Sequence, residues 1–223
     1  TLQRSMDANG SFDKSDQSSA QAMDLVLTGK AKQAFDLSRE SDKLRDTYGR
    51  DSLGEKALLA RRLVEAGSSF VVVSGAWGYF DHHGDDVRWG GIEKGLKPLL
   101  PRVDRVFHTL IHDLESRGLA DSTLVYIMGE FGRGPVINKN AGRDHWTNCM
   151  SMLAYGGEMP QGKVIGATDS RGYAIKENPI ANSNLAATVF DHLGIDKQTH
   201  WMDPTGRPRA ILVGDSRSIS QIA

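Results

Sequence analysis

The chain has 223 residues, of which 39% are hydrophobic and 25% are charged, a balance typical of a globular protein rather than a disordered one. Its 27 Lys and Arg residues are matched by 28 Asp and Glu residues, which argues against nucleic acid as a partner. The apolar runs are only a few residues long, so no transmembrane segment is predicted. The single cysteine, Cys149, excludes an internal disulfide and a cysteine-based zinc cluster.

The first third of the sequence is polar at its start and helical after that. Residues 1–19 are polar, with Gly10 and several serines, and predict a flexible lead-in. The chain opens at Thr1 without an initiator Met, as expected for a piece of a longer protein. Helical spacing of apolar residues begins at Ala20. Between residues 53 and 64 these residues recur at i, i+4 and i+7, and Gly67 follows, which predicts a helix that ends at this glycine.

Two short apolar runs come next, separated by a long amphipathic segment. Residues 70–73 (Phe-Val-Val-Val) and residues 123–128 predict strands that are buried on both faces. Between them, apolar residues at three- and four-residue spacing over 99–114 predict a helix. Pro98 or Pro101 is expected in its first turn, where the missing N–H does no harm.

The last third of the sequence continues the alternation. It predicts a third strand over 150–155, a short strand at 164–165, and a helix over 185–193 with Asn182 or Ser183 as its N-terminal cap. Strand, helix and strand with short connections is the pattern of a parallel α/β sheet. We therefore expect a ligand site beyond the carboxyl ends of the strands.

The two loops richest in metal-binding side chains directly follow two predicted strands. The loop after residues 70–73 holds Asp81, His82, His83, Asp85 and Asp86. The loop after residues 123–128 holds Glu130, Arg133, Arg143, Asp144 and His145. Carboxylates together with imidazoles suit Zn, Mn or Fe, and sets richer in oxygen favour Mn or Mg. The sequence predicts a metal site here, with a network of polar loop side chains as the alternative.

Three of these side chains have two interpretations each. Glu130 ends an apolar run, where it can bind backbone N–H groups or act as a metal ligand or general base. Arg133 and Arg143 can bind an anionic substrate through paired hydrogen bonds, or they can neutralise nearby carboxylates in a structural network.

Other candidate sites have weaker patterns. His108 and His112 lie four residues apart on the predicted helix, but without a His-Glu-x-x-His motif the sequence favours an exposed helix face over a zinc site. The chain has no Gly-x-Ser-x-Gly motif and no phosphate-binding Gly-Lys-Ser/Thr loop, which argues against an α/β-hydrolase triad and a nucleotide site. Cys149 is interpreted as a small buried residue rather than a nucleophile.

Four segments, in this order, resemble one bacterial family. They are Leu59–Gly67, Gly129–Arg133, Gly142–Trp146 and Gly166–Gly172. The family is the sulfatase-like domain of unknown function 1501, placed within the alkaline phosphatase superfamily, and the resemblance covers about residues 20 to 215. It implies a three-layer α/β/α fold with a mainly parallel sheet. It also implies that residues 20–223 are the C-terminal part of one domain, whose nucleophile lies in a half outside this chain.

The resemblance also implies a metal centre that binds an ester. Asp81, His83 and His145 match ligands of one divalent metal, and Asp144 and Glu130 are further candidate ligands. Zn or Mn is the expected ion, with Ca or Mg as alternatives. Phe131 stands where related hydrolases carry a His ligand of a second metal, which puts that second site in doubt.

These observations lead to two functional hypotheses. The first is the C-terminal part of a metal-dependent hydrolase of phosphate or sulfate esters, acting on a small anionic ester or a sulfated or phosphorylated glycan. In it, Glu130, Arg133 and Arg143 are the catalytic candidates. The second is a non-catalytic metal-binding or glycan-binding protein. A metal-independent hydrolase ranks third, because no nucleophile and base can be paired. By resemblance alone, the protein is expected to be exported.

Overall fold

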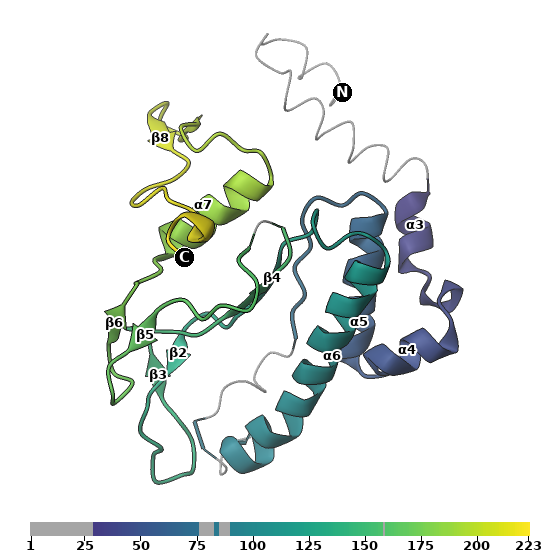
Figure 1. Cartoon of the computed structure of the whole chain (residues 1–223), viewed down its shortest axis with the longest axis horizontal. Helices are drawn as coiled ribbons and strands as arrows, with labels where there is room; N and C mark the ends of the chain where they lie inside the picture. Colours follow the sequence, from purple (N-terminus) through teal and green to yellow (C-terminus); the bar gives the residue numbers. More distant parts are fainter. Residues whose placement is uncertain (1–28, 76–82, 85–89, 158) are drawn as a thin grey trace. The chain divides into compact units, whose positions relative to one another are not determined.

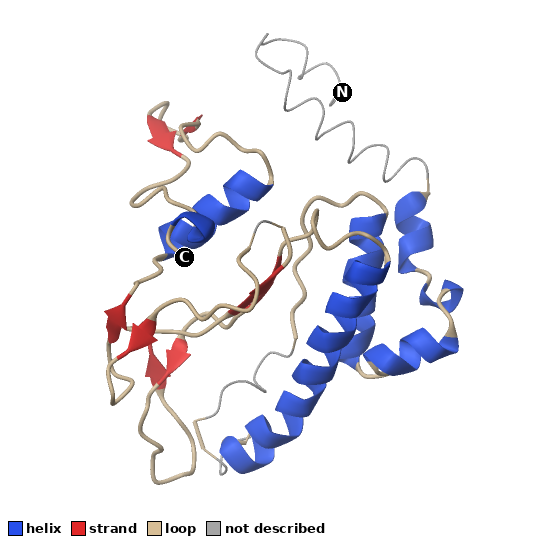
Figure 2. Cartoon of the chain, in the orientation of Figure 1, coloured by secondary structure: helices blue, strands red, loops and turns tan. Residues whose placement is uncertain are grey.

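The computed structural model describes residues 29–75, 83–84, 90–157 and 159–223. The chain divides into two compact units, Thr1–Gly75 and Ala76–Ala223, and each has its own buried residues. Figure 1 labels the elements along the chain, and Figure 2 colours helices, strands and loops separately. The predicted lead-in at residues 1–19 lies outside the described residues.

The described part of the first unit is built from helices. They are α3 (Lys30–Phe35), the 3-10 turn η1 (Leu37–Arg39), α4 (Asp42–Tyr48) and α5 (Ser52–Glu65). The residues just before the last three of these, Asp36, Ser41 and Asp51, accept hydrogen bonds from backbone N–H groups that a helix start leaves unpaired. The helix predicted over residues 53–64 is confirmed, and Gly67 follows it with a φ of 105°.

A glycine allows α4 and α5 to approach closely. A Cβ atom on Gly54 would overlap the backbone carbonyl oxygens of Tyr48 and Gly49. Tyr48 and Leu58 are buried and form part of the core of this unit. Any larger residue at position 54 would therefore push the end of α4 away from α5.

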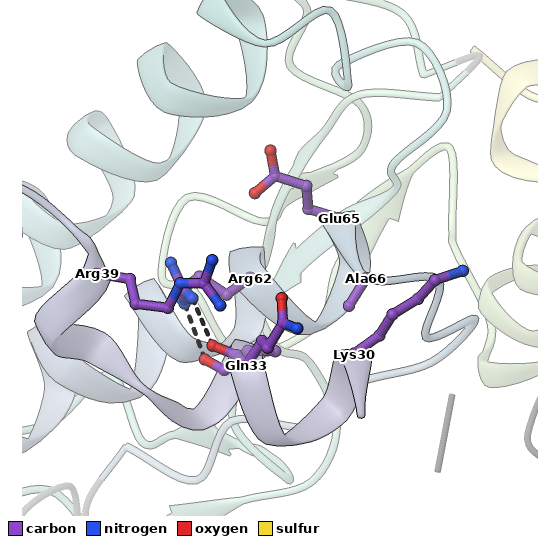
Figure 3. Close-up of a pocket in the computed structure, with 7 residues that line it drawn as sticks. Lys30, Gln33, Arg39, Arg62, Glu65 and Ala66 are labelled. Carbon is purple, nitrogen blue, oxygen red and sulfur yellow. Dashed lines mark hydrogen bonds between the residues drawn. The ribbon is translucent and has the colours of Figure 1, made fainter. Parts of the chain in front are cut away.

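Two neighbouring arginines of α5 join the helices of the first unit. The side chain of Arg61 is fully buried and pairs with Glu40 at 2.8 Å and with Glu65 at 2.5 Å. Arg62 also contacts Glu40, and it donates to two carbonyl oxygens of α3 at 2.6 and 2.8 Å. Figure 3 shows these last two bonds beside a cavity of about 400 Å³. None of the predicted site residues lines this cavity.

The described helices of the second unit are α6 (Lys97–Ser116), α7 (Asn182–His192) and two short turns. A π-helical turn, η2 (Ile92–Leu96), precedes α6, and a 3-10 turn, η3 (Ile219–Gln221), lies near the C-terminus. The helices predicted over 99–114 and 185–193 are confirmed, and Pro98 lies in the first turn of α6.

The predicted cap of α7 is wrong. Ala181 precedes this helix, not Asn182 or Ser183. The side chain of Asn184 accepts a hydrogen bond from the Ala181 N–H at 2.8 Å, so the helix start is stabilised from within its first turn.

The described strands of the second unit pair only two at a time, and every pair is antiparallel. The pairs are β1 (Val125–Ile127) with β4 (Leu153–Tyr155), β2 (Gly132–Arg133) with β3 (His145–Trp146), β5 (Ala167–Thr168) with β6 (Ile175–Glu177), and β7 (His200–Met202) with β8 (Pro208–Ala210). Because β2 and β3 lie between β1 and β4 in the sequence, residues 125–155 form one long irregular hairpin.

This topology contradicts the predicted fold class. The described residues form helices and short two-stranded antiparallel sheets, not a three-layer α/β/α fold with a mainly parallel sheet. Strands do occur within the runs 123–128 and 150–155, but they pair with each other in antiparallel fashion. Parallel pairing needs a crossover connection, usually a helix, whereas the segment between these runs is itself a hairpin.

Two other predicted strands are also wrong. Residues 70–73 are assigned to no strand, and Phe70 and Val72 are 66% and 78% exposed rather than buried. Residues 164–165 are assigned to no strand either, and Val164 is 96% exposed. An apolar run becomes a strand only when a neighbouring strand bonds to its backbone, and the described residues place no such neighbour beside either run.

Candidate functional site

The long hairpin brings Arg133 and His145 face to face. They are direct partners in the β2–β3 pair, and opposite residues in an antiparallel pair extend from the same side of the sheet. The chain can return so closely here because Gly132 has no side chain. A Cβ atom at position 132 would overlap the backbone carbonyl oxygen of Cys149.

His83 meets this hairpin through both of its ring nitrogens. Its Nε2 atom lies 2.9 Å from Nε2 of His145, and its Nδ1 atom lies 3.2 Å from Oδ1 of Asp144. An ionised carboxylate can only accept a hydrogen bond, so the Nδ1 atom of His83 carries the proton that faces Asp144. In the neutral ring, the lone pair is then on Nε2, the atom that faces His145.

A cation and an aromatic ring flank the two histidines. Arg133 Nη1 lies 3.5 Å from Nε2 of His83 and donates to the carbonyl oxygen of Arg143 at 3.2 Å. The Phe131 ring lies 4.1 Å from the His145 ring, centre to centre, and the Arg133 guanidinium lies 5.7 Å from the centre of Phe131. Phe131 therefore packs against His145. This is the position at which, by the resemblance, related hydrolases carry a histidine.

The turn of the hairpin is anchored by Asn138. Its Oδ1 atom accepts from the backbone N–H groups of Asn140 and Gly142 at 3.0 and 3.1 Å. Its Nδ2 atom donates to the carbonyl oxygen of His83 at 2.7 Å and approaches Asp144 Oδ1 at 3.4 Å. One amide side chain thus shapes the turn and also fixes the backbone of His83 against it.

The structure brings together part of the predicted site. His83, Asp144, His145 and Arg133 form one cluster, which we call the His83–His145 cluster. Arg143 contributes its backbone carbonyl and has an exposed side chain, and Glu130 is exposed in the turn between β1 and β2. The remaining candidates lie outside the described residues: Asp81, His82, Asp85 and Asp86.

The donor atoms of the cluster fit two ligands of a metal ion. Two imidazole nitrogens bound to one zinc ion at about 2.0–2.1 Å lie about 2.9 Å apart at a right angle and about 3.3 Å apart at a tetrahedral angle. The observed 2.9 Å between the two Nε2 atoms matches the lower value. The described residues contain no group of three His, Cys, Asp or Glu side chains arranged to hold a metal, and Asp81, the further ligand predicted from the sequence, lies outside the described residues.

Sequence reasoning missed Asn138 and Gly142 as positioning residues. The sequence Asn-Lys-Asn-Ala-Gly over 138–142 contains the residue types that form tight turns, and this signal was available. The turn sequence does not reveal that Asn138 also bonds the backbone of His83, because His83 lies 55 residues away in the chain.

The family of this chain follows from its sequence as a whole. A family model described as "Protein of unknown function (DUF1501)" matches residues 1–223. The chain belongs to this family. The resemblance carried by the four motifs is therefore confirmed at the level of the DUF1501 family. No curated protein and no solved structure shows a significant match to this DUF1501 chain. Among its described helices, none is both long and apolar enough to cross a membrane.

Proposed function

We propose that the His83–His145 cluster is part of a metal centre that binds phosphate or sulfate esters, and that this chain is the C-terminal part of a hydrolase acting on them. The sulfatase-like relationship is part of the same proposal and rests on the four sequence motifs. The observation that supports it most is the 2.9 Å approach of two Nε2 atoms beside a carboxylate and a guanidinium.

Each described residue has a role in this proposal. His83 and His145 are the imidazole ligands of Zn or Mn, and Asp81 is the third ligand. Asp144 holds the Nδ1–H of His83, which keeps the Nε2 lone pair directed at the ion. A bound divalent ion would act as a Lewis acid on an ester oxygen.

Arg133 gives the site its preference for anions. Its guanidinium lies beside the two imidazoles and can donate paired hydrogen bonds to a tetrahedral oxyanion. Arg143 and Glu130 are exposed on the same hairpin, and they are the further catalytic candidates in this proposal. We name no nucleophile among the described residues, and the resemblance implies that it belongs to another half of the domain.

A non-catalytic binding protein is the second candidate, and one contact favours it. Phe131 packs on His145, so position 131 supplies packing rather than a second imidazole ligand. A single metal beside Arg133 can still hold a sulfated or phosphorylated glycan without cleaving it. Export of the protein also stays a prediction.

The metal content of the purified protein tests the proposal. We expect bound transition metal in the unmodified chain, measured by inductively coupled plasma mass spectrometry after dialysis, and one equivalent less per chain in both His83→Ala and His145→Ala. His200→Ala is the matched control, because His200 is exposed and its Nδ1 atom lies 2.8 Å from the carbonyl oxygen of Gln198. The same number of metal equivalents in both site variants as in the unmodified chain would overturn the assignment.

The choice between the two functions needs an assay of the full-length protein. Hydrolysis of aryl sulfates or aryl phosphates that disappears with Arg133→Ala supports the hydrolase. A metal-loaded protein that binds these esters but releases no product supports the binding protein.

A further inference from the structure

A second pair of histidines converges on the exposed face of α6. His108 and His112 are four residues apart, so their side chains leave the helix on the same face. Their Nε2 atoms lie 3.1 Å apart and their ring centres 4.4 Å apart. Both side chains are exposed, so solvent and ions reach these nitrogens.

One of the two rings is held in place by a carboxylate. Glu115 Oε2 lies 3.1 Å from Nδ1 of His112, and the ionised carboxylate accepts the proton on that nitrogen. The lone pair of the neutral His112 ring is then on Nε2, the atom that faces His108. A carboxylate behind an imidazole is the arrangement that orients histidine ligands in metal sites.

The carboxylate is itself held by a residue from another element. Tyr155, on β4, donates its hydroxyl hydrogen to Glu115 Oε1 at 2.7 Å, so both oxygens of Glu115 are engaged. Tyr155, Glu115 and His112 thus form a chain of hydrogen bonds that ends at the exposed Nε2 atom.

The contact between His108 and His112 is closer than an exposed helix face alone would predict. Two neutral rings can share one hydrogen bond through these nitrogens, with His108 donating to the lone pair of His112, and the rings repel when both are protonated. A divalent ion can take the place of the shared proton. Two nitrogens on one zinc ion lie about 2.9–3.3 Å apart, depending on the angle between them, and the observed 3.1 Å falls within that range.

We propose that His108 and His112 bind a divalent transition-metal ion (Cu²⁺, Zn²⁺ or Ni²⁺) through their Nε2 atoms, with water as the remaining ligands. Glu115 and Tyr155 act as positioning residues. The ion bridges two successive turns of α6 and favours its helical state. This second site shares no residue with the His83–His145 cluster, and it does not depend on the function proposed for that cluster.

Copper titration of a variant that lacks the first cluster tests the second site. The protein is the full chain with His83→Ala and His145→Ala, and the probe is Cu²⁺, the tightest-binding divalent ion of the first transition row. We expect one bound equivalent with nitrogen hyperfine splitting in the electron paramagnetic resonance spectrum. His108→Ala or His112→Ala should weaken binding at least 10-fold, and the control His200→Ala should not change it.

The test of Glu115 and Tyr155 has to separate an effect on copper binding from an effect on the stability of the fold. We expect Glu115→Gln and Tyr155→Phe to weaken Cu²⁺ binding about 10-fold, while the metal-free melting temperature of Glu115→Gln changes little. Copper binding that is unaffected by His108→Ala and His112→Ala would overturn the proposal.

The copper titration can distinguish binding at His108 and His112 from binding at the His83–His145 cluster. If the double variant fails to fold, the same titration on the unmodified chain gives the answer, because His108→Ala should then remove one equivalent and leave any other unchanged. An unchanged number of equivalents would again overturn the proposal.

Discussion

Gly142 decides how closely His83 can approach the hairpin turn. The residue is buried, and a Cβ atom there would overlap the carbonyl group of His83 and the nitrogen of Gly84. Its backbone N–H also donates to Asn138, so the glycine belongs to the turn and to the site at once. A backbone contact of this kind cannot relax by a side-chain rotation.

Gly142→Ala should therefore separate His83 from Asp144 and His145. We expect an overpacking cost of about 1–3 kcal/mol and loss of bound metal, measured by chemical denaturation and by metal content. The matched control is Gly129→Ala, because a Cβ atom at Gly129 meets only an ordinary contact at 3.5 Å. Equal metal retention in both variants would show that the close approach of His83 is not needed.

Asn138 allows a second test, because its amide oxygen accepts hydrogen bonds within the turn and its amide nitrogen donates to the backbone of His83. Asn138→Asp keeps an oxygen acceptor for the turn but removes the donor to the His83 carbonyl and places a carboxylate near Asp144. Asn138→Ala removes both functions.

We expect metal affinity to fall in both Asn138 variants, with stability lost by about 1–3 kcal/mol in Asn138→Ala. Isothermal titration with Zn²⁺ and thermal melting by circular dichroism measure the two effects. A metal affinity equal to that of the unmodified chain in Asn138→Ala would contradict the positioning role.

The β7–β8 hairpin is an element whose stability should depend on pH. Asp203 accepts hydrogen bonds from the Thr205 hydroxyl and the Arg207 N–H, and Arg209 Nε lies 3.0 Å from its second oxygen. The hydrogen bond from Thr205 is the largest of the causes that lower the pKa of Asp203 to about 2. The usual pKa of Asp is about 3.9.

Because the pKa of Asp203 is lower in the folded chain, the ionised form stabilises the hairpin. This contribution is fully present above about pH 4 and is lost as the pH falls toward 2. Trp201, on β7, reports on the hairpin through its fluorescence. In a chain whose other three tryptophans are replaced by Phe, we expect its emission to shift over this range, and we expect no shift when Asp203→Asn is added. The same acid transition in both proteins would contradict the assignment.

At the scale of the whole molecule, local patterns predicted the helices well and the sheets poorly. Helix α5 follows from apolar spacing and from Gly67, which are all signals within one segment. The direction in which β1 pairs is different, because it depends on β4, some 25 residues later. The same apolar alternation fits a parallel or an antiparallel partner, and the sequence of one strand does not choose between them.

The sequence likewise predicted some residues of the candidate site but not the contacts between distant segments. Residue type and the position of two loops after predicted strands indicated His83, Asp144, His145 and Arg133, which do lie together, although residues 70–73, which precede the first loop, form no strand. The sequence did not indicate that Phe131 packs on His145, since that contact depends on the path of the hairpin. It also did not indicate that Glu115, the partner of His112, is bonded to Tyr155, because Tyr155 lies on another element.

Removal of metal should lower the thermal stability of the whole protein. A ligand at 100 times its dissociation constant adds about 2.7 kcal/mol to the free energy of unfolding, and a chelator removes that contribution. We expect excess EDTA to lower the melting temperature of the metal-loaded chain. The shift should be smaller in His83→Ala/His145→Ala and smallest when His108 and His112 are also replaced. The same shift in all three proteins would contradict both metal sites.

His83 and His145 are 62 residues apart in the sequence, yet their Nε2 atoms lie 2.9 Å apart in the folded chain. An ion bound by both would close a loop of that length, as a disulfide does. Closing it in the unfolded chain would cost about 4 kcal/mol of conformational entropy at 25 °C. In a protein with one cysteine, such an ion would serve as a reversible cross-link, made and broken by protons and chelators instead of by oxidation and reduction.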